Sequence, residues 1–193
     1  MTRIIGGTAG GRRIDVPRGT STRPSSDRVR EALFSAIESW CGSLQGLRFL
    51  DLYAGSGAVG LEAWSRGAGI VTLVEQDRRT ASMISANART LGFPRAQVLV
   101  GTVAATLTRP PAAPYDIVFL DPPYAVVDDD LREILLTLLA GGWLAAEALV
   151  TVERSTRGGE FRWPDGFEAL RSRRYGEGTF WYGRAASTCE DAR

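Results

Sequence analysis

"DLYAGSGAVG", residues Asp51 to Gly60, follows an apolar run and precedes a helical pattern. Gly55, Gly57 and Gly60 fit the spacing G-x-G-x-x-G, in which glycines let the backbone approach a ligand beside a helix N-terminus. Such a loop joins a strand to a helix in doubly wound α/β proteins. The stretch therefore predicts the first strand-to-helix turn of a fold of this class.

The chain around this turn alternates apolar runs with helical patterns. The strand candidates are LRFLDLY (47–53), GIVTLVEQ (69–76), AQVLVG (96–101), YDIVFLD (115–121) and EALVTVE (147–153). Helical stretches begin near Ala58, Asp77, Thr102 and Asp128. Because strands alternate with helices, we expect a mainly parallel sheet that binds ligands at the carboxyl ends of its strands.

Smaller elements are expected at both ends of the chain. Two short β-like runs around a Gly-rich turn predict a hairpin over Arg3 to Val16. A helix should follow, with Ser25 and Ser26 as N-cap candidates after Pro24. The stretch FEALRSRRYGEGTFWYGRA (167–185) predicts an antiparallel hairpin that closes the sheet edge.

Two residue types are absent from the 193-residue sequence: it has no histidine, and all 23 of its basic residues are arginine. A Ser-His-Asp triad, a His-ligated metal site, Schiff-base chemistry and a P-loop lysine are therefore excluded. Any chemistry must rest on carboxylates, hydroxyls, backbone groups or a bound cofactor. The longest apolar run, Ile134 to Ala146, is too short to span a membrane, so we expect a cytoplasmic protein without membrane contact.

Positive charge is concentrated near the N-terminus. Residues 1–30 carry a net charge of +5, and the remainder carries −4. Because arginine grips phosphate with a planar fork, this arm is a candidate for binding a nucleic-acid backbone; a solvated terminus is the alternative. The candidate phosphate ligands are Arg12, Arg13, Arg23, Arg28 and Arg30.

Two acids at strand ends indicate how a cofactor would be held. Asp51 lies four residues before Gly55, where a carboxylate would repel a pyrophosphate but accept a hydrogen bond from an ammonium group. This favours the methionine part of S-adenosylmethionine, while capping of the loop is the alternative for Asp51. Glu75, at the next strand end, can accept both ribose hydroxyls of an adenosine; an exposed strand-end acid is its alternative. We expect adenine contacts near Thr102, after the third strand.

"FLDPPYAV", residues 119 to 126, ends the fourth strand with an unusual set of side chains. The Asp121 carboxylate and the Pro122 carbonyl could hold the two hydrogens of an exocyclic amine on a base and favour a more tetrahedral nitrogen. The prolines would keep that carbonyl aimed, and Tyr124 could stack on the base. The alternative is an acid followed by a proline turn. We interpret the motif as a binding site for a base amine.

Four stretches, in this order and spacing, resemble the bacterial small-subunit ribosomal RNA guanine-N2 methyltransferases. They are Gly6-Gly7 with Gly11-Arg12-Arg13, TRPSSDRVREALF (22–34), DLYAGSGAVGLEAWSRGA (51–68) and FLDPPY (119–124). The resemblance runs from Arg3 to about Arg184, and its departures are Tyr53 in place of Phe, Ser25 in place of Thr, and no acid in the adenine-contact segment.

The resemblance implies an α/β, Rossmann-like class I methyltransferase that uses S-adenosylmethionine, releases S-adenosylhomocysteine and needs no metal. It implies a seven-stranded, mostly parallel sheet with an antiparallel C-terminal hairpin and a small N-terminal hairpin and helix. Its substrate would be one guanine of 16S ribosomal RNA in the assembled or assembling small subunit, and we expect a monomer. The predicted domains are an RNA-contacting extension (1–45), a catalytic domain (46–185) and a flexible tail (186–193).

The expected site has a catalytic part and a cofactor part. The catalytic residues are Asp121, Pro122, Pro123 and Tyr124. The cofactor residues are Asp51, Tyr53, Ala54, Gly55, Ser56, Gly57, Glu75, Gln76, Thr102 and Asp121.

Three alternatives remain open. A DNA adenine-N6 methyltransferase would use the same D-P-P-Y motif, but the sequence has no insertion large enough for a target-recognition region. A dinucleotide oxidoreductase would use the glycine loop and leaves D-P-P-Y unexplained. A non-catalytic ribosome-assembly factor that retains the fold would bind RNA without turnover.

Overall fold

The computed structural model describes residues 2–17, 25–123 and 125–186, and only the backbone of residues 25 and 26. The chain divides into two compact units, Met1–Thr106 and Leu107–Arg193. Arg23, Tyr124 and residues 187–193 of the predicted tail lie outside the described residues. The expected boundary between residues 45 and 46 separates an RNA-contacting extension from a catalytic domain, and it stays a prediction.

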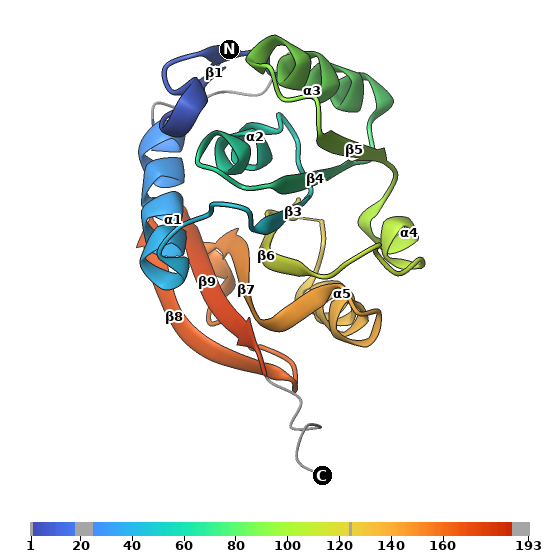
Figure 1. The fold of residues 1–193 in the computed structure, drawn as a ribbon. Coiled ribbons are helices and arrows are strands. Elements are labelled where there is room, and N and C mark those ends of the chain that lie inside the picture. Colours follow the sequence, from blue (N-terminus) through green and yellow to red (C-terminus); the bar gives the residue numbers. More distant parts are fainter. Residues whose placement is uncertain (1, 18–24, 124, 187–193) are drawn as a thin grey trace. The chain divides into compact units, whose positions relative to one another are not determined.

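The first unit opens with a small hairpin and a long helix (Figure 1). The hairpin consists of β1 (Thr2–Arg3) and β2 (Arg13–Ile14), with the 3-10 helix η1 (Gly7–Ala9) between them, and α1 (Ser25–Cys41) follows. The later elements are β3 (Arg48–Leu52), α2 (Ala58–Ser65), β4 (Ile70–Glu75), α3 (Arg78–Leu91), β5 (Ala96–Val100) and α4 (Val103–Leu107). This order confirms the expected alternation of strands and helices. Strand β4 pairs in parallel with both β3 and β5, as predicted for this kind of fold.

Helix α1 buries one face against the first unit. Leu33, Phe34 and Ile37 recur at helical spacing and are at most 1% exposed. The ring of Phe34 stacks on Phe49 of β3, with 6.2 Å between centroids. Full burial of a side chain of this size contributes about 2 kcal/mol, so this stripe holds α1 to the sheet.

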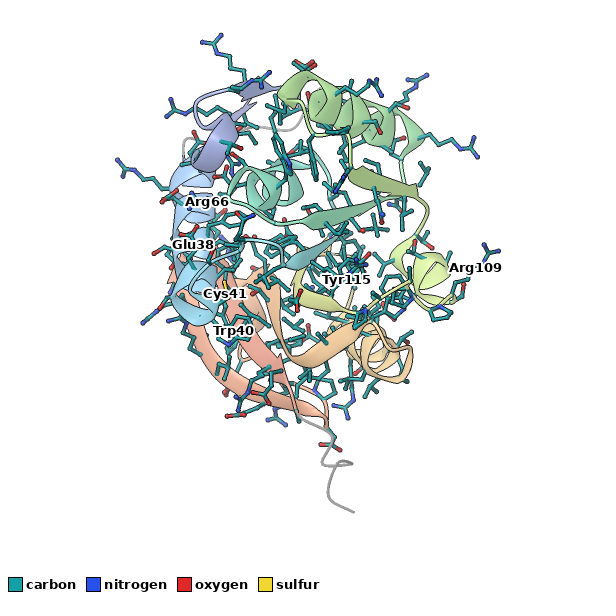
Figure 2. All side chains as sticks on the ribbon, in the orientation of Figure 1. Glu38, Trp40, Cys41, Arg66, Arg109 and Tyr115 are labelled. Carbon is teal, nitrogen blue, oxygen red and sulfur yellow. The ribbon has the colours of Figure 1, made fainter. Side chains whose placement is uncertain are left out.

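A buried carboxylate anchors the N-terminal hairpin to α2. Glu62 is 0% exposed, and its two carboxylate oxygens accept the backbone N–H groups of Ile5 (2.7 Å) and Gly6 (2.8 Å). The same carboxylate accepts a hydrogen bond from Arg66 Nε at 2.9 Å. Arg66 reaches further, to Glu38 of α1, at 3.3 Å (Figure 2). One buried charge and its partners therefore connect the hairpin, α1 and α2.

The hairpin also approaches the C-terminal end of α2 very closely. Ser65 Oγ donates to the Gly6 carbonyl oxygen at 2.6 Å and accepts from the Ala9 N–H at 2.9 Å. Gly7 has a φ of +74°, and a Cβ placed there would lie 1.8 Å from the Ser65 carbonyl oxygen. Only glycine fits both the backbone conformation and the space at this position.

The second unit is built around an antiparallel C-terminal hairpin (Figure 1). Its elements are β6 (Tyr115–Leu120), α5 (Asp128–Ala140), β7 (Leu144–Ser155), η2 (Thr156–Gly158), β8 (Phe167–Tyr175) and β9 (Gly178–Ala185). Strands β6 and β7 pair in parallel, and β9 pairs antiparallel with both β7 and β8. Gly183 of β9 is explained by packing, because a Cβ there would lie 2.7 Å from the Trp163 ring.

The predicted fold class is confirmed. The first unit holds three parallel strands, β3, β4 and β5, and the second holds four, of which β6 and β7 pair in parallel and β8 and β9 form the antiparallel C-terminal hairpin. The strand ends differ from the predicted ones by a few residues, most at β7, which begins at Leu144 rather than Glu147. No helix among the described residues is long and apolar enough to cross a membrane.

Replacing Gly7 by alanine should detach or strain the hairpin, because the new methyl group would overlap the Ser65 carbonyl. Gly11 is the matched control: its φ of +81° is similar, but a Cβ there would meet nothing within 4 Å. We expect Gly7→Ala to lower the free energy of unfolding by about 3 kcal/mol and Gly11→Ala by about 1 kcal/mol, measured by urea titration. Equal losses in the two variants would contradict the close packing at Gly7.

Candidate active site

The loop between β3 and α2 has the backbone geometry that the glycine spacing predicts. Tyr53, Gly55 and Gly57 have positive φ angles of 81°, 54° and 76°. The Gly57 N–H donates to the Ala54 carbonyl at 2.7 Å, and the Gly57 carbonyl accepts from Leu61 as α2 begins. The loop is thus a tight turn that presents backbone groups at the N-terminus of a helix.

The three glycines are required for different reasons. A Cβ on Gly57 would lie 2.9 Å from Ile84, and one on Gly60 would lie 2.6 Å from Leu73, so both allow close packing inside the unit. A Cβ on Gly55 would meet only the Tyr53 carbonyl oxygen, at 3.9 Å. Gly55 therefore has open space beside it, which suits the approach of a ligand.

Asp51 lies at the base of this loop and is 1% exposed. Its carboxylate accepts the N–H of Gly60, in the first turn of α2, at 3.0 Å. A carboxylate in this place satisfies a backbone donor that has no partner within the helix. The capping role considered for Asp51 is thus present, and its role toward an ammonium group stays a prediction.

Glu75, at the end of β4, joins the glycine loop to the turn after its own strand. One carboxylate oxygen accepts the Gly55 N–H at 2.9 Å, and the other accepts the Asp77 N–H at 2.8 Å. An ionised carboxylate has about four lone-pair positions, so two hydrogen bonds leave acceptor capacity for hydroxyl groups. The side chain is therefore placed beside the loop and can still bind a diol.

The end of β5 lies beside Glu75. Val100 pairs with Glu75 in the parallel register, and the Gly101 N–H donates to the Glu75 carbonyl oxygen at 3.0 Å. Thr102 follows as an exposed residue whose hydroxyl accepts the Ala105 N–H at 3.2 Å. Val100 is 54% exposed, whereas an apolar residue at the end of an apolar strand is expected from sequence to be buried. The other predicted cofactor residues, Ser56 and Gln76, are also accessible.

In the second unit, the D-P-P segment follows β6 directly. Asp121 and Pro123 are exposed and Pro122 is buried, while Tyr124 lies outside the described residues. The Pro123 carbonyl accepts the Val126 N–H at 2.9 Å, which closes a turn. Pro122 is thus packed within the protein, whereas the acid before it is an exposed residue.

Arg154 of β7 supports the segment after this turn. It donates from Nη1 to the Val126 carbonyl oxygen at 3.0 Å and from Nη2 to Asp128 at 2.7 Å. These contacts tie the start of α5 to β7. This role could not be predicted from sequence, since Arg154 is 28 residues from Val126 along the chain.

A second carboxyl group, that of Glu153, neighbours Asp121. Leu120 pairs with Val152, so the two acids follow at the same level of adjacent parallel strands. Although Asp121 is an exposed residue, crowding by protein atoms desolvates its carboxyl and raises its pKa to about 6. Desolvation, and then the charge of Asp121, raise the pKa of Glu153 to about 8. The two groups titrate as a pair near neutral pH.

The structure contradicts the prediction that Arg30 is exposed to bind an RNA phosphate. Arg30 is only 6% exposed. Its Nη2 donates to Asp27 at 3.2 Å, and its Nε lies 3.6 Å from Glu62. A buried, ion-paired guanidinium stabilises the fold and is not available to an external phosphate.

The other arginines of the arm differ from one another. Arg12 donates from Nη1 to the Leu91 carbonyl oxygen at 3.0 Å and also to the Thr90 carbonyl, so it caps the C-terminus of α3. Arg13 and Arg28 are exposed, and their role toward RNA stays a prediction. Among the described residues, no cluster of acids and cysteines is arranged to hold a metal ion.

Comparison with known proteins identifies the family. A family model described as conserved hypothetical protein 95 matches residues 2–184. Ribosomal RNA small subunit methyltransferase D of Escherichia coli (strain K12) is 41% identical over 157 residues, which are 81% of this chain and 76% of the relative. This chain belongs to the ribosomal RNA small subunit methyltransferase D family. The resemblance found in the sequence is confirmed.

A second relative and a solved structure agree with this assignment. The methyltransferase D of Haemophilus influenzae is 37% identical over 155 residues, which are 78% of this chain and 77% of the relative. The solved structure of the putative methyltransferase yhhF from Escherichia coli superposes with a TM-score of 0.83 at 33% identity, covering 97% of this chain and 99% of that one. The methyltransferase fold therefore extends over nearly the whole chain.

The raised pKa of Asp121 gives this methyltransferase a pH-dependent stability. A folded pKa near 6 exceeds the unfolded value, about 4, so this group lowers the free energy of unfolding as the pH rises from about 4 to 6, and the full loss is present above pH 6. Asp121→Asn removes this effect, and its gain in melting temperature over the wild type should be larger at pH 8 than at pH 5. Asp165→Asn, at an exposed acid of the same unit, controls for net charge. A gain that is equal at both pH values would show that Asp121 is not desolvated.

Proposed function

We propose that this chain transfers a methyl group from S-adenosylmethionine to the N2 amine of a guanine in 16S ribosomal RNA. The observation that carries the proposal is Asp121 followed by Pro122 at the carboxyl end of β6, in a chain whose relatives are named ribosomal RNA small subunit methyltransferases. The substrate would be RNA of the assembled or assembling small subunit, and the enzyme would act as a cytoplasmic monomer.

The first unit fits S-adenosylmethionine. Open space beside Gly55 admits the ligand to the loop, and Glu75 retains acceptor positions for the ribose hydroxyls. Asp51 would accept the ammonium group of the methionine part, and Val100 and Thr102 would border the adenine. The bound cofactor supplies an electrophilic methyl carbon on a sulfonium centre, so the protein needs no nucleophile or metal of its own.

The second unit supplies the groups that activate the amine. The lone pair of guanine N2 is delocalised into the ring, which makes the amine a poor nucleophile. The Asp121 carboxylate and the Pro122 carbonyl accept its two hydrogens and favour a tetrahedral nitrogen. Pro123 fixes the direction of that carbonyl, because its ring restricts the backbone, and Tyr124 would stack on the base.

The transfer balances without a covalent enzyme intermediate. The N2–methyl bond forms while the carbon–sulfur bond breaks, and the electron pair of the broken bond stays on sulfur. The methylated nitrogen then loses one proton, which passes to Asp121 or to water. The target base must be unpaired or turned out of its stack, at a cost of a few kcal/mol.

Asp121 must be ionised to accept the amine hydrogens. Because desolvation of its carboxyl raises its pKa to about 6, kcat/KM should fall about tenfold per pH unit below pH 6 and level off above it. The measurement is the pH dependence of methyl transfer at saturating cofactor. A rate that stays constant down to pH 5 would show that the pKa of Asp121 is not raised to about 6.

The function is tested by transfer of labelled methyl from S-adenosylmethionine to unmodified small ribosomal subunits, protein-free small-subunit RNA, duplex DNA and buffer. We expect label in N2-methylguanine of ribosomal RNA. Asp121→Ala should abolish transfer and leave cofactor affinity within a few-fold of the wild type. Equal loss of transfer and cofactor affinity would show that Asp121 is structural.

The other outcomes distinguish the competing functions. Label in DNA adenine would replace the proposal with a DNA adenine-N6 methyltransferase. Tight binding of NAD(H) instead of S-adenosylmethionine would indicate an oxidoreductase. Cofactor binding without label in any acceptor would indicate a non-catalytic assembly factor.

A further inference from the structure

A row of side chains crosses the four strands of the second unit at the level of the acceptor acid. Glu153 of β7, the neighbour of Asp121, pairs with Phe180 of β9, and Phe180 pairs with Arg173 of β8. Directly paired residues project to the same face of a sheet, and adjacent strands are about 4.8 Å apart. Arg173 therefore lies three strand spacings from Asp121, roughly 14 Å, on the same face.

Strand β8 forms the edge of the sheet and is rich in exposed arginine. Arg171, Arg173 and Arg174 are all exposed, although Phe180 and Tyr182 of the neighbouring strand are at most 2% exposed. Arg171 is held over the Tyr182 ring, with 5.1 Å from its guanidinium carbon to the centroid. The edge strand thus presents cations to solvent next to a buried strand.

Acids of the same hairpin are paired with other arginines. Glu168 pairs with Arg184, and Glu177 lies 3.9 Å from Arg157. Among the described residues, no acid forms an ion pair with Arg173 or Arg174. Arg174 Nε donates to the Gly176 carbonyl oxygen at 3.3 Å, which directs this guanidinium toward the hairpin turn. The charges of Arg173 and Arg174 are therefore not neutralised by an ion pair within the described part of the hairpin.

We propose that Arg173 and Arg174 of β8 bind phosphate groups of the RNA that flank the target guanine. This inference rests on the proposed function, because it places a second RNA contact at the level of the proposed acceptor site. Guanidinium groups bind phosphate bidentately, and the two side chains leave opposite faces of one edge strand, so together they can follow a backbone that passes this edge. The arm from Arg3 to Arg30 is then one of two RNA-contacting surfaces.

The test compares two double variants. Arg173→Gln/Arg174→Gln removes the two charges and keeps polar side chains of similar length. Arg109→Gln/Arg132→Gln removes two charges from exposed positions elsewhere in the same unit, and Figure 2 shows Arg109 at the surface. Affinity for protein-free small-subunit RNA is measured at several salt concentrations, together with S-adenosylmethionine affinity and melting temperature.

We expect the β8 variant to bind RNA about tenfold more weakly at low salt. The slope of log affinity against log salt should become shallower by about 0.7–0.9 for each lost phosphate contact. Cofactor affinity and melting temperature should match the wild type, and the control variant should bind RNA within about twofold of it.

The possible results distinguish failure of this inference from failure of the proposed function. Unchanged RNA affinity and salt slope, or equal losses in the control variant, would show that β8 makes no specific contribution. Weaker binding to small subunits with unchanged binding to naked RNA would assign the surface to a ribosomal protein. RNA binding that depends on Arg173 and Arg174 without methyl transfer by the wild type would support the inference and refute the proposed function.

Discussion

The buried carboxylate of Glu62 is the interaction on which the first unit depends. It accepts two backbone N–H groups from the N-terminal hairpin and a hydrogen bond from Arg66, which also reaches Glu38 of α1. A buried charge without such partners is strongly unfavourable, so the hairpin and Arg66 stabilise the burial of this carboxylate. The hairpin is therefore an integral part of the unit, and its arginines are divided between structural and exposed roles.

Carboxylates serve two distinct purposes in this protein. Asp51 accepts a backbone N–H group of the first turn of α2, and Glu75 accepts those of Gly55 in the glycine loop and Asp77 in the turn after β4, so both acids shape the backbone around the loop. Asp121 and Glu153 instead lie together at adjacent strand ends, where desolvation raises the pKa of both carboxyls. The first pair organises the backbone, and the second provides carboxyl groups that change charge near neutral pH.

Arginine carries every positive charge of the chain, and burial decides what each one does. Arg30 and Arg66 are at most 9% exposed and pair with acids, whereas Arg154 holds the segment that follows the D-P-P turn. Such contacts depend on which acids or carbonyls lie nearby in space. Counting charges along the N-terminal arm therefore overestimated the exposed positive charge there, because Arg30 is buried, and it did not reveal the exposed arginines of β8.

The sequence by itself determined the order of strands and helices, the glycine loop, the acids at the ends of β3, β4 and β6, and the family. These features are local, because periodicity, glycine spacing and strand-end motifs are set by neighbours along the chain. Only the tertiary structure decided that Arg30 is buried, that Glu153 neighbours Asp121, and that Arg173 lies in the same row of the sheet. Strand register and burial arise from contacts between residues far apart in sequence, and these contacts set the charge and accessibility of each group.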